Sequence, residues 1–154
     1  MVQAVEDVEG FGGCVRWKLP HTLGEDIVEW TTAHIEHVLS QGYVRTFYIG
    51  ITHKVGSRWT DPVSGHRSKG WHRMYLLAVS DDSGEIARAE TSLIERFRFY
   101  GPRGVRLGTR EVAGRIVGHP LCQNKLPGAE GGFHGNPPHV IYVCWRWNRR
   151  GQSN

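Results

Sequence analysis

The sequence lacks a long apolar segment and has only three cysteines. No apolar run approaches the roughly 18 residues of a membrane-spanning helix. Glu6, Asp7 and Glu9 stand where a signal peptide would need an apolar stretch. The cysteines are odd in number and form no CxxC pair, so neither a disulfide framework nor a zinc knuckle is indicated. We therefore expect an intracellular protein, cytoplasmic or nuclear, without a membrane contact.

Acidic and basic residues are distributed unevenly along the chain. Residues 1–44 carry two Lys and Arg against seven Asp and Glu, whereas residues 45–154 carry 17 against eight. The basic region from residue 45 onwards favours binding to polyanions, because each phosphate that a Lys or Arg neutralises releases counterions and adds affinity. Many basic soluble proteins bind no nucleic acid, so charge alone leaves that alternative open.

The length of 154 residues allows one sizeable core and predicts a single domain. Residues 1–13 end in a glycine-rich stretch and are expected to form a loose leader, with the domain over residues 14–150. Apolar and polar residues alternate at about 14–19, 43–52, 74–79 and 140–145, which predicts four strands.

Helical patterns fall between these strands. Thr22 to Glu25 has the form of a capping box, and the apolar face that follows predicts a helix over about 23–40. Further helices are expected at about 84–99 and, from a weaker pattern, at 109–117, with one helical turn near Arg58. The order of elements predicts an α/β fold of the α+β type, a small, mainly antiparallel sheet flanked by helices, with a helical insertion at about 22–41.

Glu90 interrupts the apolar face of the helix expected at 84–99. It lies four residues after Ile86 and four before Ile94, so helical geometry directs it towards the core. A buried carboxylate loses its hydration, which costs several kcal/mol of folding free energy unless a nearby cation compensates its charge. A metal ion, a structural arginine, or a side chain that reaches outward from the edge of the face would each explain it.

The strand at 43–52 contains Tyr48-Ile49-Gly50, in which Tyr48 and Gly50 share one face. A glycine inside a strand gives up packing, and close approach by a ligand or another backbone is one reason to accept that. A half-buried tyrosine beside a bulge is the simpler alternative. Arg58 and His66 follow in a basic stretch, and they offer a cation for phosphate oxygens and an acid or base.

The spaced series Tyr48-Ile49-Gly50, Arg58, His66, Glu90 and Asn124 resembles the GIY-YIG nuclease family over residues 43–132. The resemblance implies that Tyr48, Arg58, His66 and Glu90 are catalytic, with Glu90 holding one Mg²⁺ or Mn²⁺. It implies a late structural or substrate-positioning role for Asn124. Residues expected to bind the substrate, which is DNA more readily than RNA, are Gly50, Thr52, Arg67, Lys69, Asn124 and Arg146.

The first motif of that family, a GIY-like triplet about ten residues before YIG, is not found in that form. Gly42-Tyr43-Val44 is similar but lies on the same expected strand as Tyr48. The partner strand is therefore expected at residues 14–19, with Trp17 or no aromatic residue in place of the tyrosine.

Three functions stay open at this point. The first is a metal-dependent endonuclease that hydrolyses phosphodiester bonds in nucleic acid. The second is a binding module on the same scaffold, in which loss of the first tyrosine has ended catalysis. The third is an enzyme that uses Tyr48, Arg58 and Glu90 on a small substrate, since a fold does not fix a function. A small-molecule pocket enclosed by the helical insertion and the loop that begins at Pro127 would be its sign.

Overall fold

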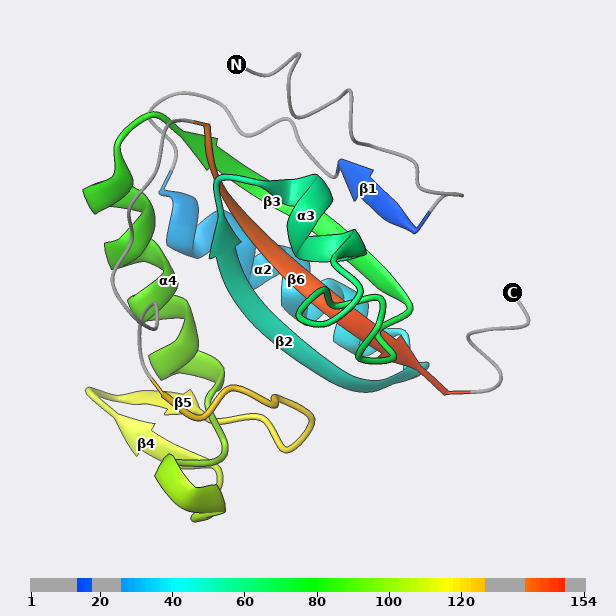
Figure 1. Cartoon of the computed structure of the whole chain (residues 1–154). Helices are drawn as coiled ribbons and strands as arrows, with labels where there is room; N and C mark the ends of the chain where they lie inside the picture. Colours follow the sequence, from blue (N-terminus) through cyan, green and yellow to red (C-terminus); the bar gives the residue numbers. More distant parts are fainter. Residues whose placement is uncertain (1–13, 18–25, 127–137, 149–154) are drawn as a thin grey trace.

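The computed structural model describes residues 14–17, 26–126 and 138–148, and within them a four-stranded mixed sheet forms the centre of the fold (Figure 1). The strand order is β1-β3-β6-β2, and β1 pairs with β3 in parallel while the other pairings are antiparallel. The strands span Val15–Trp17 (β1), Val44–Thr52 (β2), Arg73–Ser80 (β3) and His139–Trp147 (β6). The expected α/β fold with a mainly antiparallel sheet is confirmed.

Two long helices cover one face of the sheet. Helix α2 (Ile27–Ser40) begins after Asp26, whose Oδ1 accepts hydrogen bonds from the backbone N–H groups of Val28 and Glu29. The capping box expected at residues 22–25 lies outside the described residues, and Asp26 caps the helix as it is observed. Helix α2 ends before Gly42, where a φ of +79° suits glycine.

Helix α4 (Ser83–Phe97) carries Glu90, and it is capped in the same way as α2. The Oδ1 of Asp82 accepts hydrogen bonds from the backbone N–H groups of Gly84 and Glu85. This cap fixes where the helix begins and therefore which residues its buried face presents.

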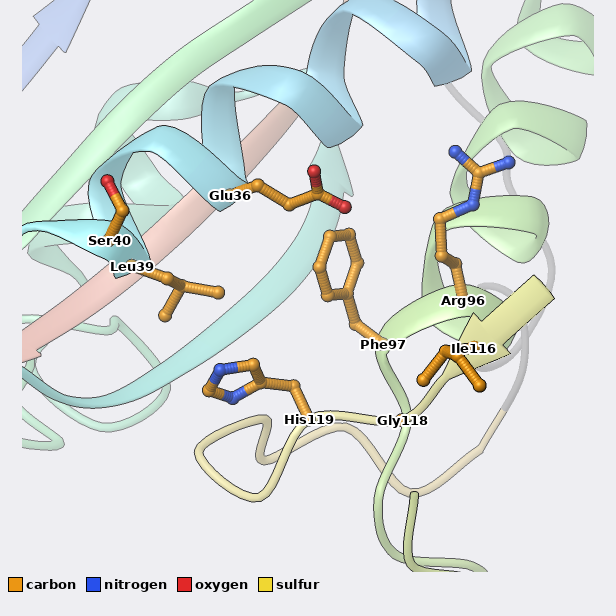
Figure 2. A pocket seen from close by; sticks show the side chains of 8 residues that line it. All are labelled: Glu36, Leu39, Ser40, Arg96, Phe97, Ile116, Gly118 and His119. Carbon is orange, nitrogen blue, oxygen red and sulfur yellow. The ribbon is translucent and has the colours of Figure 1, made fainter. Parts of the chain in front are cut away.

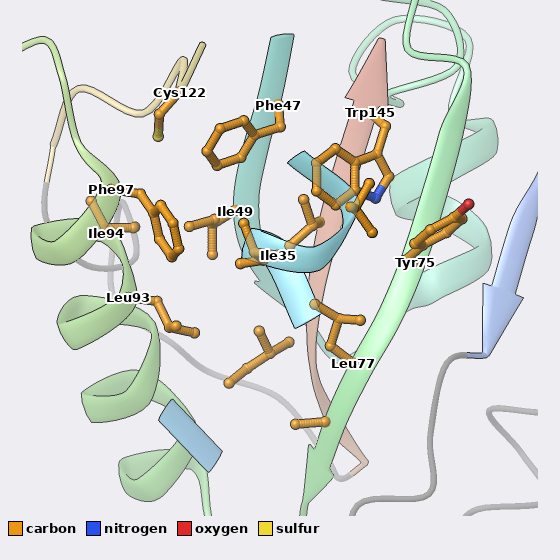
Figure 3. Packing of buried hydrophobic residues seen from close by; sticks show 14 of the residues in the cluster. Ile35, Phe47, Ile49, Tyr75, Leu77, Leu93, Ile94, Phe97, Cys122 and Trp145 are labelled. Atoms are coloured by element: carbon orange, nitrogen blue, oxygen red, sulfur yellow. The ribbon is translucent and has the colours of Figure 1, made fainter. Parts of the chain in front are cut away.

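The larger apolar core lies between the sheet and helices α2 and α4 (Figure 3). Strand residues such as Phe47, Ile49 and Trp145 point into it, and Leu93 and Phe97 of α4 meet them. A smaller core on the opposite face packs helix α3 (Val55–Thr60) against the sheet, with Trp59 and Trp71 fully or nearly fully buried. The helical turn expected near Arg58 is this helix.

The expectation of a helix at 109–117 is wrong. These residues form a hairpin of β4 (Arg110–Val112) and β5 (Arg115–Val117), which follows a short 3₁₀ turn, η1 (Pro102–Gly104). The two residues between the strands, Ala113 and Gly114, have φ values of +52° and +78°, as a type I′ turn requires. The apolar residues have a spacing that also suits a helix, but the two-residue turn makes this segment a β-hairpin.

No helix in the described part of the chain is both long enough and apolar enough to cross a membrane.

Candidate active site

Tyr142 lies directly over Gly50 on the face of the sheet that α3 covers. The two residues are register partners on β6 and β2. A Cβ at position 50 would lie 2.5 Å from Cζ and 2.9 Å from Cε2 of Tyr142, so only glycine leaves room for the ring. Tyr142 is 2% exposed. The glycine of the Tyr48-Ile49-Gly50 triplet is therefore explained by the close approach of an aromatic side chain.

The expected partner of the Tyr48 strand was wrong. Residues 15–17 form β1, which pairs with β3 at the far edge of the sheet, and the partner of β2 is the C-terminal strand β6. Trp17 thus does not stand opposite Tyr48. Tyr142 of the triplet Ile141-Tyr142-Val143 occupies the neighbouring strand instead, although it follows Tyr48 in the chain by 94 residues.

His66 joins Tyr142 to helix α3. Its Nε2 lies 2.7 Å from the phenol oxygen of Tyr142, and its backbone N–H donates to the carbonyl of Arg58 at 2.8 Å. The carbonyl of His66 accepts from the backbone N–H groups of Lys69 and Trp71, at 3.1 Å each. The loop after α3 is therefore folded around His66, and it sets the imidazole against the phenol.

Burial, together with the positive charges of Arg58, Lys69 and Arg146, lowers the pKa of His66 to about 4. The ring is therefore neutral at pH 7, and Nε2 can accept the hydrogen bond that the Tyr142 hydroxyl donates. Its other nitrogen, Nδ1, is buried and has no hydrogen-bond partner among the described residues.

Glu90 is buried on the inner side of α4, at 3% exposure, as its spacing predicts. Its Oε1 has no hydrogen-bond partner in the described part of the chain, and none of the salt bridges found there involves it. Neither an outward-reaching side chain nor a paired arginine accounts for this carboxylate. A buried, unpartnered carboxylate oxygen is costly unless a ligand completes it.

Burial raises the pKa of Glu90 to about 7, and the positive charge of Arg58 opposes that rise. Burial also raises the pKa of the Tyr142 phenol well above its usual value; nearby Cys144, Tyr48 and Glu90 add to the rise, while Arg58 lowers it. These mutual effects link Tyr142, Glu90 and Arg58 electrostatically, although they belong to three separate elements.

Glu90 fits a site for one hard divalent cation. Its free oxygen is the donor type that Mg²⁺ prefers, and Mg²⁺ commonly binds one or two carboxylates together with waters and substrate phosphates. No group of three or more His, Cys, Asp or Glu that could hold a metal occurs within residues 14–17, 26–126 and 138–148. A metal here would therefore have at most two described ligands of these types, and Glu90 is the one whose free oxygen is observed.

Tyr48 and Arg58 border this group. The Tyr48 ring is half-buried, with its centroid 5.5 Å from that of His66 and 6.3 Å from that of Trp71. Arg58 is exposed on α3, and the structure records no salt bridge from its guanidinium to a described residue. Its charge therefore remains available to an anionic ligand.

Two residues expected near the substrate are engaged by the protein. Thr52 is buried, and its hydroxyl accepts from the Lys54 N–H at 2.9 Å where α3 begins. Asn124 is buried beside the outer edge of β2: its Oδ1 accepts from the Ile49 N–H and its Nδ2 donates to the Ile49 carbonyl, each at 2.8 Å. Of the two roles expected for Asn124, these contacts favour the structural one.

The basic residues expected to bind substrate lie around the loop after α3. Arg67 and Lys69 are exposed, and Arg146 projects from β6 on the same face as Tyr142. Lys69 contacts His66 through its backbone N–H, and the charges of Lys69 and Arg146 contribute to the lowered pKa of His66.

A cavity of about 380 Å³ lies on the other face of the sheet, between α2, α4 and β5 (Figure 2). Glu36, Phe97 and His119 are directed towards it. None of the candidate catalytic residues lines it. The cavity borders α2, the helix of the expected insertion, whereas residues 127–137 lie outside the described residues. Because Tyr48, Arg58 and Glu90 do not line it, it gives no support to a small-substrate enzyme that uses them.

Replacing Gly50 by alanine is expected to displace Tyr142 and to break its contact with His66. Overpacking of this kind typically costs about 1–3 kcal/mol, which thermal unfolding would record. Gly101→Ala is the matched control, because the atom nearest an added Cβ there is Cδ2 of Leu107 at 3.5 Å, an ordinary contact distance. Equal melting temperatures for Gly50→Ala and wild type would contradict the close packing.

Comparison of the chain with protein-family models, with curated proteins and with solved structures gave no match.

Proposed function

We propose that the protein is a metal-dependent nuclease of the GIY-YIG type, which hydrolyses phosphodiester bonds in nucleic acid, with DNA as its substrate. The observation that carries the proposal is the Tyr142–His66 pair packed over Gly50, with the unpartnered carboxylate of Glu90 coupled to the same phenol. A hydroxyl on a neutral imidazole, a free cation and a free carboxylate are the groups that phosphodiester hydrolysis uses.

In this proposal Tyr142 is the general base. Its oxygen takes a proton from the attacking water while its own proton passes to Nε2 of His66, 2.7 Å away. The low pKa of His66 keeps Nε2 free to accept that proton and prevents the ring from retaining it. The water oxygen then bonds to phosphorus as the bond to the leaving oxygen breaks; the leaving oxygen takes up a proton from solvent, and His66 releases its added proton to solvent.

Arg58 stabilises the negative charge that develops on the phosphate oxygens, because its guanidinium has no described carboxylate to neutralise it. Glu90 would hold the divalent cation. When bound, that cation would supply positive charge to the phosphate oxygens and cancel the carboxylate charge that raises the pKa of Tyr142.

A binding module that has lost its catalytic tyrosine finds less support. That alternative depended on the absence of an aromatic residue beside Tyr48, and Tyr142 occupies that position on the neighbouring strand.

The proposal is tested by incubating the full chain with supercoiled plasmid, single-stranded DNA and RNA, with Mg²⁺, with Mn²⁺ and with EDTA. Cleavage of DNA that requires the metal is expected. Absence of turnover on every substrate in both metals, with the protein folded by circular dichroism, would overturn the proposal.

Arg58→Ala is expected to slow DNA cleavage by about 10²–10³-fold, the usual effect of removing one preorganised donor. The side chain is exposed and forms no salt bridge with a described residue, so the melting temperature should stay close to that of wild type. Arg88→Ala, an exposed arginine on α4, is the matched control. A cleavage rate for Arg58→Ala equal to that of the control would remove Arg58 from the mechanism.

A further inference from the structure

Three cations gather at the end of the sheet where β2 begins and β6 ends. Arg45 lies at the irregularity in the pairing of these strands, where Val44 pairs with Trp147 and Thr46 pairs with Arg146. Lys69 approaches from the loop after α3. We call Arg45, Lys69 and Arg146 the basic ledge.

Arg146 is held in a fixed orientation. Its guanidinium carbon lies 3.9 Å from the ring centroid of Trp71, and its Nη2 donates to the Lys69 carbonyl at 2.8 Å. Trp71 is itself 8% exposed, so the platform beneath the guanidinium is part of the smaller core. A fixed planar guanidinium loses less entropy on binding a phosphate than a mobile one.

Carboxylates do not neutralise the ledge in the described structure. The salt bridges there join Arg96 and Arg115 to Glu29, and Arg98 to Glu95. Between Thr52 and Asp81 the sequence contains one acidic residue, Asp61. Its Oδ1 accepts from the backbone N–H groups of Val63 and Ser64.

The like charges of the ledge act on one another. Burial lowers the pKa of Arg146, and the charge of Arg45 lowers it further; Arg45, Arg73 and Arg146 also add to the effect of burial on the pKa of His72. Cations held together without a counterion favour binding of an anion that spans them.

The ledge adjoins the candidate active site. Arg146 stacks on Trp71, the Trp71 ring lies 6.3 Å from that of Tyr48, and the Tyr48 ring lies 5.5 Å from that of His66. A series of packed rings therefore leads from the Tyr142–His66 pair to Arg146, and the charge of Arg146 interacts with that of Arg45. A chain with evenly spaced negative charges would meet both ends of it.

We propose that the basic ledge binds the sugar-phosphate backbone of the DNA on one side of the bond that is cut. The inference rests on the proposed function for its reference point, the reacting phosphate. It assigns to Arg45 a phosphate contact remote from the reaction, and it extends the footprint of the DNA past Trp71 to the start of β2.

The test measures the affinity for a fluorescein-labelled DNA duplex by anisotropy, in EDTA, between 50 and 200 mM KCl. Arg45→Asn is expected to weaken binding and to reduce the slope of log K against log [KCl] by about 1, the value for one lost phosphate contact. Arg103→Asn is the matched control: this exposed arginine has a φ of +60°, which asparagine tolerates.

An unchanged salt-dependence slope for Arg45→Asn, or an equal reduction of the slope in the control, would contradict DNA binding by the basic ledge. Because EDTA prevents metal-dependent turnover, the result is independent of catalysis. An Arg45-dependent slope without cleavage in Mg²⁺ would support the ledge and contradict the nuclease. Metal-dependent cleavage with no effect of Arg45→Asn on binding would do the reverse.

Discussion

Replacing Tyr142 by phenylalanine is expected to slow DNA cleavage by about 10²–10⁴-fold, the usual contribution of a positioned acid or base. The substitution keeps the ring over Gly50 and removes only the oxygen that lies 2.7 Å from His66 Nε2. Single-turnover rates with saturating enzyme would separate this loss from any change in DNA binding.

The loss of the Tyr142 hydroxyl also leaves His66 Nε2 without that partner in a buried place, which costs about 1–3 kcal/mol. Circular dichroism and the melting temperature must therefore accompany the rates. Tyr100→Phe is the matched control, because Tyr100 is only half-buried and lies after α4, outside the candidate site. Wild-type rates in folded Tyr142→Phe would show that another group is the base.

Glu90→Gln is expected to abolish metal-dependent cleavage and to raise the melting temperature at pH 8. Glutamine is nearly isosteric but binds Mg²⁺ poorly and carries no charge. The folded pKa of Glu90 is about 7 and its usual value is 4.5, so ionisation destabilises the metal-free fold. Stability from the protonated carboxyl is fully present below pH 4.5, and it is lost as the pH rises through 7.

The size of this effect follows from the difference between the two pKa values. It amounts to about 3 kcal/mol above pH 7, or roughly 5–10 °C in melting temperature for a chain of this length. Thermal unfolding in EDTA at pH 5 and pH 8 would measure it, with wild type and variant differing much less at pH 5.

Magnesium provides the complementary measurement on Glu90. At pH 8 it is expected to raise the melting temperature of wild type and to leave that of Glu90→Gln unchanged, because a ligand that binds only the folded state stabilises it. A variant that is less stable than wild type at pH 8 in EDTA would contradict an unpartnered carboxylate and indicate a structural ion pair.

Local patterns in the sequence predicted the elements that depend on local interactions. The alternation in residues 43–52 corresponds to β2, and the apolar spacing around Glu90 placed that carboxylate on the buried side of α4. Burial follows from helical geometry, which is fixed within four residues of each position. The unpartnered Oε1 could not be predicted, because it depends on whether elements distant in the sequence place a hydrogen-bond donor beside it.

Strand pairing was the step that the sequence did not determine. The sequence places the expected partner strand before Tyr48, at residues 14–19, whereas β6 pairs with β2 across nearly 100 residues. Pairing of distant strands depends on the whole core and not on local pattern. A signal for Tyr142 was present in the alternation of β6, which sets it and Arg146 on the face opposite Ile141 and Val143.

The hairpin at 110–117 was missed for a different reason. Its apolar residues have a spacing that also suits a helix, and the decisive feature is the two-residue turn at Ala113 and Gly114. Asn124 illustrates the same limit at the site. Its place in the spaced series left a structural and a substrate-positioning role open, and only the fold reveals that both its side-chain polar atoms bind Ile49.

The most direct test of the account is the single-turnover rate of DNA cleavage in Mg²⁺ for wild type, Tyr142→Phe and Glu90→Gln, with the bound fraction of DNA measured in the same samples. The account predicts metal-dependent cleavage by wild type and bound but uncut DNA for both variants. Cleavage by either folded variant at the wild-type rate would contradict a site built from Tyr142, His66 and Glu90.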